Sequence, residues 1–161
     1  MKIEKFYIKQ NNVSLHEVDD KWKWFKGALG TIDGTLIEII VPASERGEYR
    51  DRKGNLSTNV LRACDANLKF TYVLLGWEGS TSDSHVLHDA LTKRNSLEVP
   101  QNKYIYYLVD LGYTNGQEFL AHYKGTRYHL NLWRGNTLTN YKELFNLRYF
   151  AARNTIKCGF G

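Results

Sequence analysis

The segment YIYYLVDLGY, residues 104–113, constrains the fold of this chain more than any other stretch. It is an almost unbroken apolar run, rich in aromatic and β-branched residues, which is the pattern of a strand buried on both faces of a sheet. Such a strand needs other elements packed above and below it, so the chain has to form layers around a sheet. The apolar run leads into Asp110, which predicts a carboxylate at the carboxyl end of that strand.

The segments before this run predict further strands. Residues 28–41 read as two short strands separated by Asp33-Gly34, a dipeptide that favours a tight hairpin turn, so Asp33 is expected at a strand end. Residues 59–64 and 69–77 are also strand-like, and a turn is expected between them. We therefore expect three antiparallel strands that follow one another along the chain.

Two other segments repeat their apolar residues at helical spacing. In residues 80–93, Ser80 and Asp83 have the spacing of a capping box, so we expect the helix to begin at Ser80. Residues 140–156 predict a second amphipathic helix. Strands followed by helix, strand and helix predict a mixed α/β (α+β) domain, in which helices flank a central mixed sheet.

Length and composition fit one globular domain. The chain has 161 residues, of which 42% are hydrophobic, and 2 prolines, which excludes collagen-like and largely disordered chains. A net charge of +5 permits an anionic partner such as nucleic acid without requiring one. The aromatic content of 14% suits a ring-packed core, which we favour, or base stacking, although no segment has the glycine-aromatic pattern of an RRM strand.

The cysteines and the hydrophobic pattern bear on the environment of the chain. Cys64 and Cys158 are far apart and form no CxxC motif, which argues against a zinc knuckle or a disulfide-rich scaffold and fits a reducing compartment. The polar residues 1–24 read as an entry segment without a secretory signal, ahead of one domain over residues 25–161. A transmembrane helix is not expected, because no run of about 18 apolar residues occurs.

Asp33 and Asp110 are the first candidates for chemistry. Each follows an apolar run and precedes a glycine in a predicted turn. Two carboxylates held close together repel each other unless a cation lies between them, and oxygen ligands of this kind select Mg²⁺ or Mn²⁺. Metal pairs about 3.5–4 Å apart are used to attack phosphodiesters. Taken singly, each aspartate is better explained as a turn former, and the metal site is the alternative that stays open.

Other polar side chains have weaker signals. A loop from residue 42 to residue 57 carries four cations, Arg46, Arg50, Arg52 and Lys53. Several cations on one loop are expected either to contact phosphates or to be simply solvated. His85 and His88, three residues apart on the predicted helix, are better explained by an exposed face than by a metal site. Cys64 is expected to be a small buried residue.

Five ordered blocks, which together span most of the chain from residue 32 onward, resemble the PIF/Harbinger-type DDE transposases and the nucleases derived from them. The blocks are IDGTL (32–36), YRDRKGNLSTNVLRACD (49–65), FTYVLLGWEGSTSDSHVLHDAL (70–91), YYLVDLGYTN (106–115) and KELFNLRYFAARNTIKCGFG (142–161). Asp83 lies in the third block, where helix capping is a sufficient role for it, although it could also assist the site. Any one block alone would be a weak signal, whereas five in order are specific.

The resemblance implies an RNase H-like fold and a divalent metal cofactor, Mg²⁺ or Mn²⁺, that cuts DNA. In that family two Asp and one Glu hold the metal, and the first two correspond to Asp33 and Asp110 of this chain. DNA is then the expected partner. The nucleus is the expected location, and the cytoplasm is an additional one. Residues 1–24 show no DNA-binding segment like the one that precedes the nuclease domain in the family, which leaves room for a separate DNA-binding partner protein.

The chain departs from the family in its last block. The family pattern resembles RNxIERxFG, whereas this chain reads RNTIKCGFG, with Lys157 at the Glu position and Cys158 at the Arg position. An ammonium about 4 Å from one unit of metal charge costs about 4 kcal/mol at an effective dielectric constant of about 20, and a divalent ion doubles that cost. We therefore expect weakened cleavage. Leu36 also replaces the usual His beside the first Asp.

Two consequences of this departure stay open. Glu143 or Glu118 is a candidate to replace the lost Glu, and the alternative is an inactive derivative that serves as a DNA-binding or protein-interaction module. The sequence also stops at Gly161, whereas the last helix of related domains continues, so the domain is expected to be incomplete at its C-terminus.

Overall fold

The structure is a computed structural model, and it describes residues 7–8, 20–93, 96–110, 112–113, 116–126 and 140–158. For residues 7–8 and 155–158 only the backbone is described. The chain divides into two compact units. The first unit comprises residues 1–12, 32–63 and 70–98, and the second comprises residues 13–31, 64–69 and 99–161.

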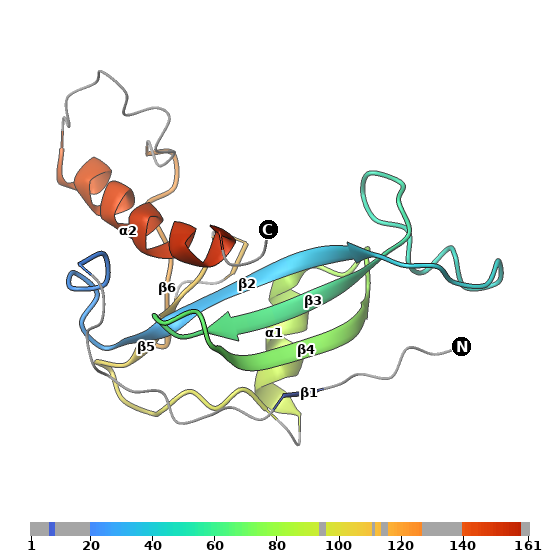
Figure 1. Cartoon of the computed structure of the whole chain (residues 1–161), viewed down its shortest axis with the longest axis horizontal. Helices are drawn as coiled ribbons and strands as arrows, with labels where there is room; N and C mark the ends of the chain where they lie inside the picture. The colour runs from blue at the N-terminus through green and yellow to red at the C-terminus, as the bar shows by residue number, and fades with distance from the viewer. Residues whose placement is uncertain are drawn as a thin grey trace. The chain divides into compact units, whose positions relative to one another are not determined.

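Within the described residues, six strands are hydrogen-bonded in the order β1-β4-β3-β2-β5-β6 (Figure 1). The strands are β1 (Tyr7–Ile8), β2 (Ala28–Glu38), β3 (Ser57–Cys64), β4 (Phe70–Glu78), β5 (Tyr106–Leu108) and β6 (Phe119–Leu120). The helices are α1 (Asp83–Thr92) and α2 (Tyr141–Cys158). β1 runs antiparallel to β4, whereas β2, β5 and β6 are parallel to one another. The mixed α/β (α+β) prediction is therefore confirmed, and the arrangement is consistent with the nuclease fold of DDE proteins.

The expected hairpin turn at Asp33-Gly34 is wrong. β2 continues without interruption from Ala28 to Glu38, so Asp33 lies inside a strand and not at its end. The prediction used the turn preference of an Asp-Gly pair, which acts only where no tertiary contact competes with it. Here Gly34 is needed in extended backbone because another side chain approaches its Cα closely, as described below.

In the first unit, α1 covers one face of β3 and β4 (Figure 1). Its buried apolar face consists of Val86, Leu87 and Ala90. The helix begins at Asp83 and its N-cap is Ser82, whose hydroxyl accepts the backbone N–H of His85, so the expected start at Ser80 is wrong by two to three residues. Ser80 instead donates its hydroxyl to the Glu48 carbonyl at 3.4 Å.

The second unit has a core of aromatic rings. Its buried members are Trp22, Phe25, Leu108, Tyr149, Phe150 and Ala152. The Phe25 and Tyr149 rings meet edge to face with centroids 5.9 Å apart, a preferred aromatic geometry. The expectation that the rings form a core is confirmed for these residues. α2 corresponds to the helix predicted over 140–156, whereas the two-residue strands β1 and β6 were not predicted.

Cys64 is buried, as expected for a small apolar side chain, and the side chain of Cys158 lies outside the described residues. In the part of the chain that the structure describes, no helix has both the length and the apolar character needed to cross a membrane.

Candidate active site

Asp33 lies half-buried in the part of β2 that belongs to the first unit. The next residue, Gly34, has no side chain, and a Cβ atom there would lie 2.6 Å from Oδ1 of Asp83. The glycine therefore lets the Asp83 carboxylate approach the backbone of β2. Because side chains alternate between the faces of a strand, Asp33 leaves β2 on the face opposite to the one that Asp83 approaches.

Asp83 is held by a buried amide of β3. The Asn59 Nδ2 donates to Asp83 Oδ1 at 2.9 Å and to the Thr81 carbonyl at 3.1 Å. Asp83 also stands in the first turn of α1, where a negative charge is favoured by the helix dipole. Ser82, not Asp83, caps α1, which corrects the capping role expected for Asp83. Asp83 instead joins α1 to the sheet.

Asp110 lies in the second unit, two residues after the end of β5. The residue before it is fixed on both sides, because the Val109 N–H donates to the Leu120 carbonyl at 3.0 Å and the Tyr149 hydroxyl donates to the Val109 carbonyl. The Leu120 carbonyl lies 2.8 Å from the same hydroxyl, so the two carbonyls share its single hydrogen. Burial raises the pKa of Tyr149 well above its usual range, so its hydroxyl stays a proton donor.

The Asp110 carboxylate has a cationic partner inside the protein. Arg153 Nη1 of α2 lies 3.3 Å from Asp110 Oδ2, and the side chains are 3% and 46% exposed respectively. A guanidinium keeps its charge at any ordinary pH, so its burial is tolerable only with partners of this kind. Sequence reasoning missed Arg153, although an arginine among the apolar residues of a helix face is itself a signal of a paired buried charge.

The described residues do not contain a complete metal site. Nowhere in that part of the chain do three His, Cys, Asp or Glu side chains gather as ligands for one ion. Asp33 and Asp110 belong to different units, so their pairing at one metal stays a prediction. Position 157 lies in α2 one helical turn beyond Arg153, and the Lys157 side chain is outside the described residues.

The family of the chain follows from its sequence as a whole. Residues 32–161 match the family model described as DDE superfamily endonuclease. The chain belongs to this family. Comparisons with curated proteins and with solved structures found no match. DDE endonucleases generally use divalent metals and act on DNA, and the carboxylate oxygens of Asp33 and Asp110 are of the kind that Mg²⁺ and Mn²⁺ prefer.

The two glutamates considered as substitutes for the lost acid lie away from Asp110. Glu143 is in the first turn of α2, ten residues before Arg153, which is roughly 15 Å along the helix axis. The Glu118 carbonyl accepts the N–H of Tyr107, so the Glu118 backbone lies beside Tyr107. Tyr107 precedes Asp110 by three residues, which is roughly 10 Å along an extended chain. The Glu118 carboxylate accepts the Gln101 amide at 3.1 Å. Neither position is next to Asp110.

The four cations of the basic loop lie on the surface of the first unit. They are Arg46, Arg50, Arg52 and Lys53, all exposed. Asp51 orders the loop, since its Oδ1 accepts the backbone N–H of Lys53 at 2.8 Å and of Asn55 at 2.9 Å. The Arg50 guanidinium donates to the Gly54 carbonyl at 3.0 Å. Their exposure fits phosphate contacts and simple solvation alike, so the phosphate-binding role stays a prediction.

His85 and His88 are exposed on α1, and the His85 ring meets Trp77 edge to face with centroids 5.0 Å apart. This is the exposed helix face that the sequence predicts.

Proposed function

We propose that this domain descends from a Harbinger-type transposase nuclease and hydrolyses DNA phosphodiesters weakly, because Lys157 replaces its third acid. The observation that carries the proposal is the environment of Asp110. Its carboxylate is half-exposed, whereas the residues around it, Val109, Tyr149 and Arg153, are buried. A rigid support with one accessible carboxylate suits a group that must meet a ligand in fixed geometry.

The register of the parallel strands supports a shared metal. Thr31 of β2 pairs with Leu108 of β5, and Asp33 and Asp110 each follow two residues later in the sequence. The two carboxylates would hold a divalent ion, which would activate water and stabilise charge on the phosphate. Lys157 repels that ion and offers it no oxygen, so the ion binds more weakly than in a site with three acids. A nuclear location belongs to the same proposal, because the substrate is DNA.

The proposal is tested by returning the lost acid. Three proteins are incubated with supercoiled plasmid and Mn²⁺ or Mg²⁺. They are the wild type, Lys157→Glu, and the double variant that combines Lys157→Glu with Asp33→Asn. Lys157→Glu is expected to nick the plasmid at least about 100-fold faster than wild type, because a single charge-stabilising group at a reaction centre is commonly worth that factor. The added Asp33→Asn change should abolish the gain. A folded Lys157→Glu protein that nicks no faster than wild type contradicts the proposal.

A second candidate function is favoured by the same lysine. A domain that binds DNA without cutting it needs no third acid, and the positive charge of a lysine attracts phosphate. Binding that persists in EDTA, together with no gain of nicking in Lys157→Glu, supports this candidate. Absence of DNA binding in EDTA would leave a protein-interaction role.

A further inference from the structure

A short turn ahead of β2 presents one tryptophan to solvent and buries two other aromatic residues. In residues 20–27, Trp22 and Phe25 are buried in the core of the second unit, and the Phe25 N–H donates to the Trp22 carbonyl at 2.9 Å. Trp24 between them is 51% exposed. Two buried aromatic residues therefore hold the turn in place, and with it the backbone of Trp24.

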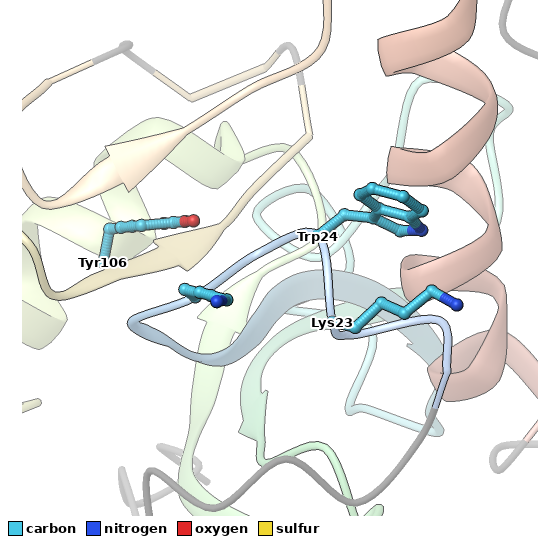
Figure 2. A pocket seen from close by; sticks show the side chains of 4 residues that line it. Lys23, Trp24 and Tyr106 are labelled. Atoms are coloured by element: carbon cyan, nitrogen blue, oxygen red, sulfur yellow. The ribbon is translucent and has the colours of Figure 1, made fainter.

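The exposed ring is flanked by cations. The Arg148 guanidinium carbon, from α2, lies over one face of the Trp24 ring, 3.5 Å from its centroid, so a base would have to stack on the other face. Lys23 Nζ lies 5.3 Å from the same centroid. Figure 2 shows Trp24 and Lys23 beside α2 and Tyr106 on the neighbouring strand. Together with Lys26 they line a pocket of about 580 Å³. The pocket is open to solvent, as a surface that receives an extended strand has to be.

The charge of this surface is positive. The turn carries Lys21, Lys23 and Lys26 against Asp20, and Arg148 adds a fourth cation. Asp20 pairs with Lys23 at 3.3 Å, but the Asp20 side chain is 92% exposed and that of Lys23 48% exposed. Such a surface pair contributes little, so another anion can replace Asp20. Burial raises the pKa of Tyr106, so its hydroxyl remains neutral and can donate to an anionic ligand.

We propose that the surface formed by Lys23, Trp24, Lys26, Tyr106 and Arg148 binds an unpaired DNA strand, with a base stacked on Trp24 and phosphates beside the three cations. A flat exposed ring flanked by cations is the combination that single-strand binders use, because every base has a face that can stack. An acidic peptide satisfies the cations but places no ring on Trp24. The identification of DNA as the nucleic acid rests on the proposed function, whereas the site itself does not require cleavage.

The test measures binding of a fluorescein-labelled dT20 oligonucleotide to the full chain in EDTA. Because EDTA removes divalent metal, the binding result does not depend on whether the domain cuts DNA. Trp24→Ala is expected to weaken binding about 5-fold or more, whereas Trp24→Phe retains most of the affinity. Arg148→Glu should weaken binding and reduce its salt dependence. A 20-base-pair duplex should bind more weakly than dT20, because its bases are already stacked.

Two variants on α2 serve as matched controls. Lys142→Glu makes the same charge change as Arg148→Glu, and Tyr141→Ala removes a ring that is 71% exposed. Both are expected to bind dT20 within about 2-fold of wild type, and circular dichroism checks that every variant is folded. Equal losses in Arg148→Glu and Lys142→Glu would show an unspecific charge effect and overturn the site. Unchanged affinity in Trp24→Ala, or competition by a poly-glutamate peptide as strong as that by dT20, would overturn it too.

Discussion

Asp110 and Arg153 form an ion pair in which one partner is in water and the other is not. The carboxylate is 46% exposed, whereas the guanidinium is 3% exposed. Water can replace the arginine around the carboxylate, but it reaches the arginine poorly. The two residues therefore depend on each other to different degrees.

This asymmetry predicts unequal effects of removing each partner. Asp110→Ala should lower the free energy of unfolding by about 3 kcal/mol, because it removes the carboxylate that pairs with the buried Arg153 guanidinium. Arg153→Met should lower it by only about 1 kcal/mol. Urea unfolding of both variants and of the double variant measures the difference. If Arg153→Met proves the more destabilising change, the buried guanidinium is not held by Asp110.

The candidate site combines residues with a local sequence signal and residues without one. Asp33 and Asp110 stand out in sequence because each is an acid at the edge of an apolar run, a local signal. Arg153 and Asn59 act on residues 43 and 24 positions away, as the Asp110 and Asp83 contacts show. No local pattern encodes such contacts, so the supporting groups appeared only when the fold was known.

At the scale of elements, the junction of α1 with β2 and β3 depends on the space left by one glycine. The Asp83 carboxylate occupies the place where a Gly34 side chain would be, and Asn59 holds it there. Asp83 cannot move aside without losing that hydrogen bond. α1 is thus tied to the sheet at its first residue and packs on it through Val86, Leu87 and Ala90.

Gly34→Ala should therefore destabilise the first unit by about 1–3 kcal/mol, the usual range for overpacking. Gly47→Ala is the matched control in the same unit, because a Cβ atom there meets nothing within 4 Å. Thermal unfolding of the two variants checks the prediction. In an Asp83→Ala background, the Gly34→Ala change should cost much less than it does in wild type, because the carboxylate that meets the new Cβ atom is gone. Equal melting temperatures for the two glycine variants would show that the contact has no effect.

Long helices and strands could be predicted from the sequence, whereas two-residue strands could not. β3, β4, α1 and α2 each have enough residues to show a period, and all four were expected near their observed bounds. β1 and β6 have two residues each, too few for any period. The Asp33-Gly34 turn failed for a different reason, since the glycine serves a contact with Asp83 that lies 49 positions further along the chain.

At the scale of the whole molecule, the two units each contain one of the two acids. Asp33 belongs to the first unit and Asp110 to the second, and β2 runs through both. The family match over residues 32–161 includes both aspartates. The basic surface around Trp24 belongs to the second unit alone, so its binding can be measured independently of the metal.

The central claim is that Asp33 and Asp110 share one divalent ion. A crystal of the full chain soaked in Mn²⁺, with anomalous diffraction data, tests it directly. We expect one anomalous peak whose distances to a carboxylate oxygen of Asp33 and to one of Asp110 are both about 2.0–2.6 Å, the range that an ion requires. Carboxylates more than about 8 Å apart could not ligate the same ion at those distances, and finding them so would contradict the claim.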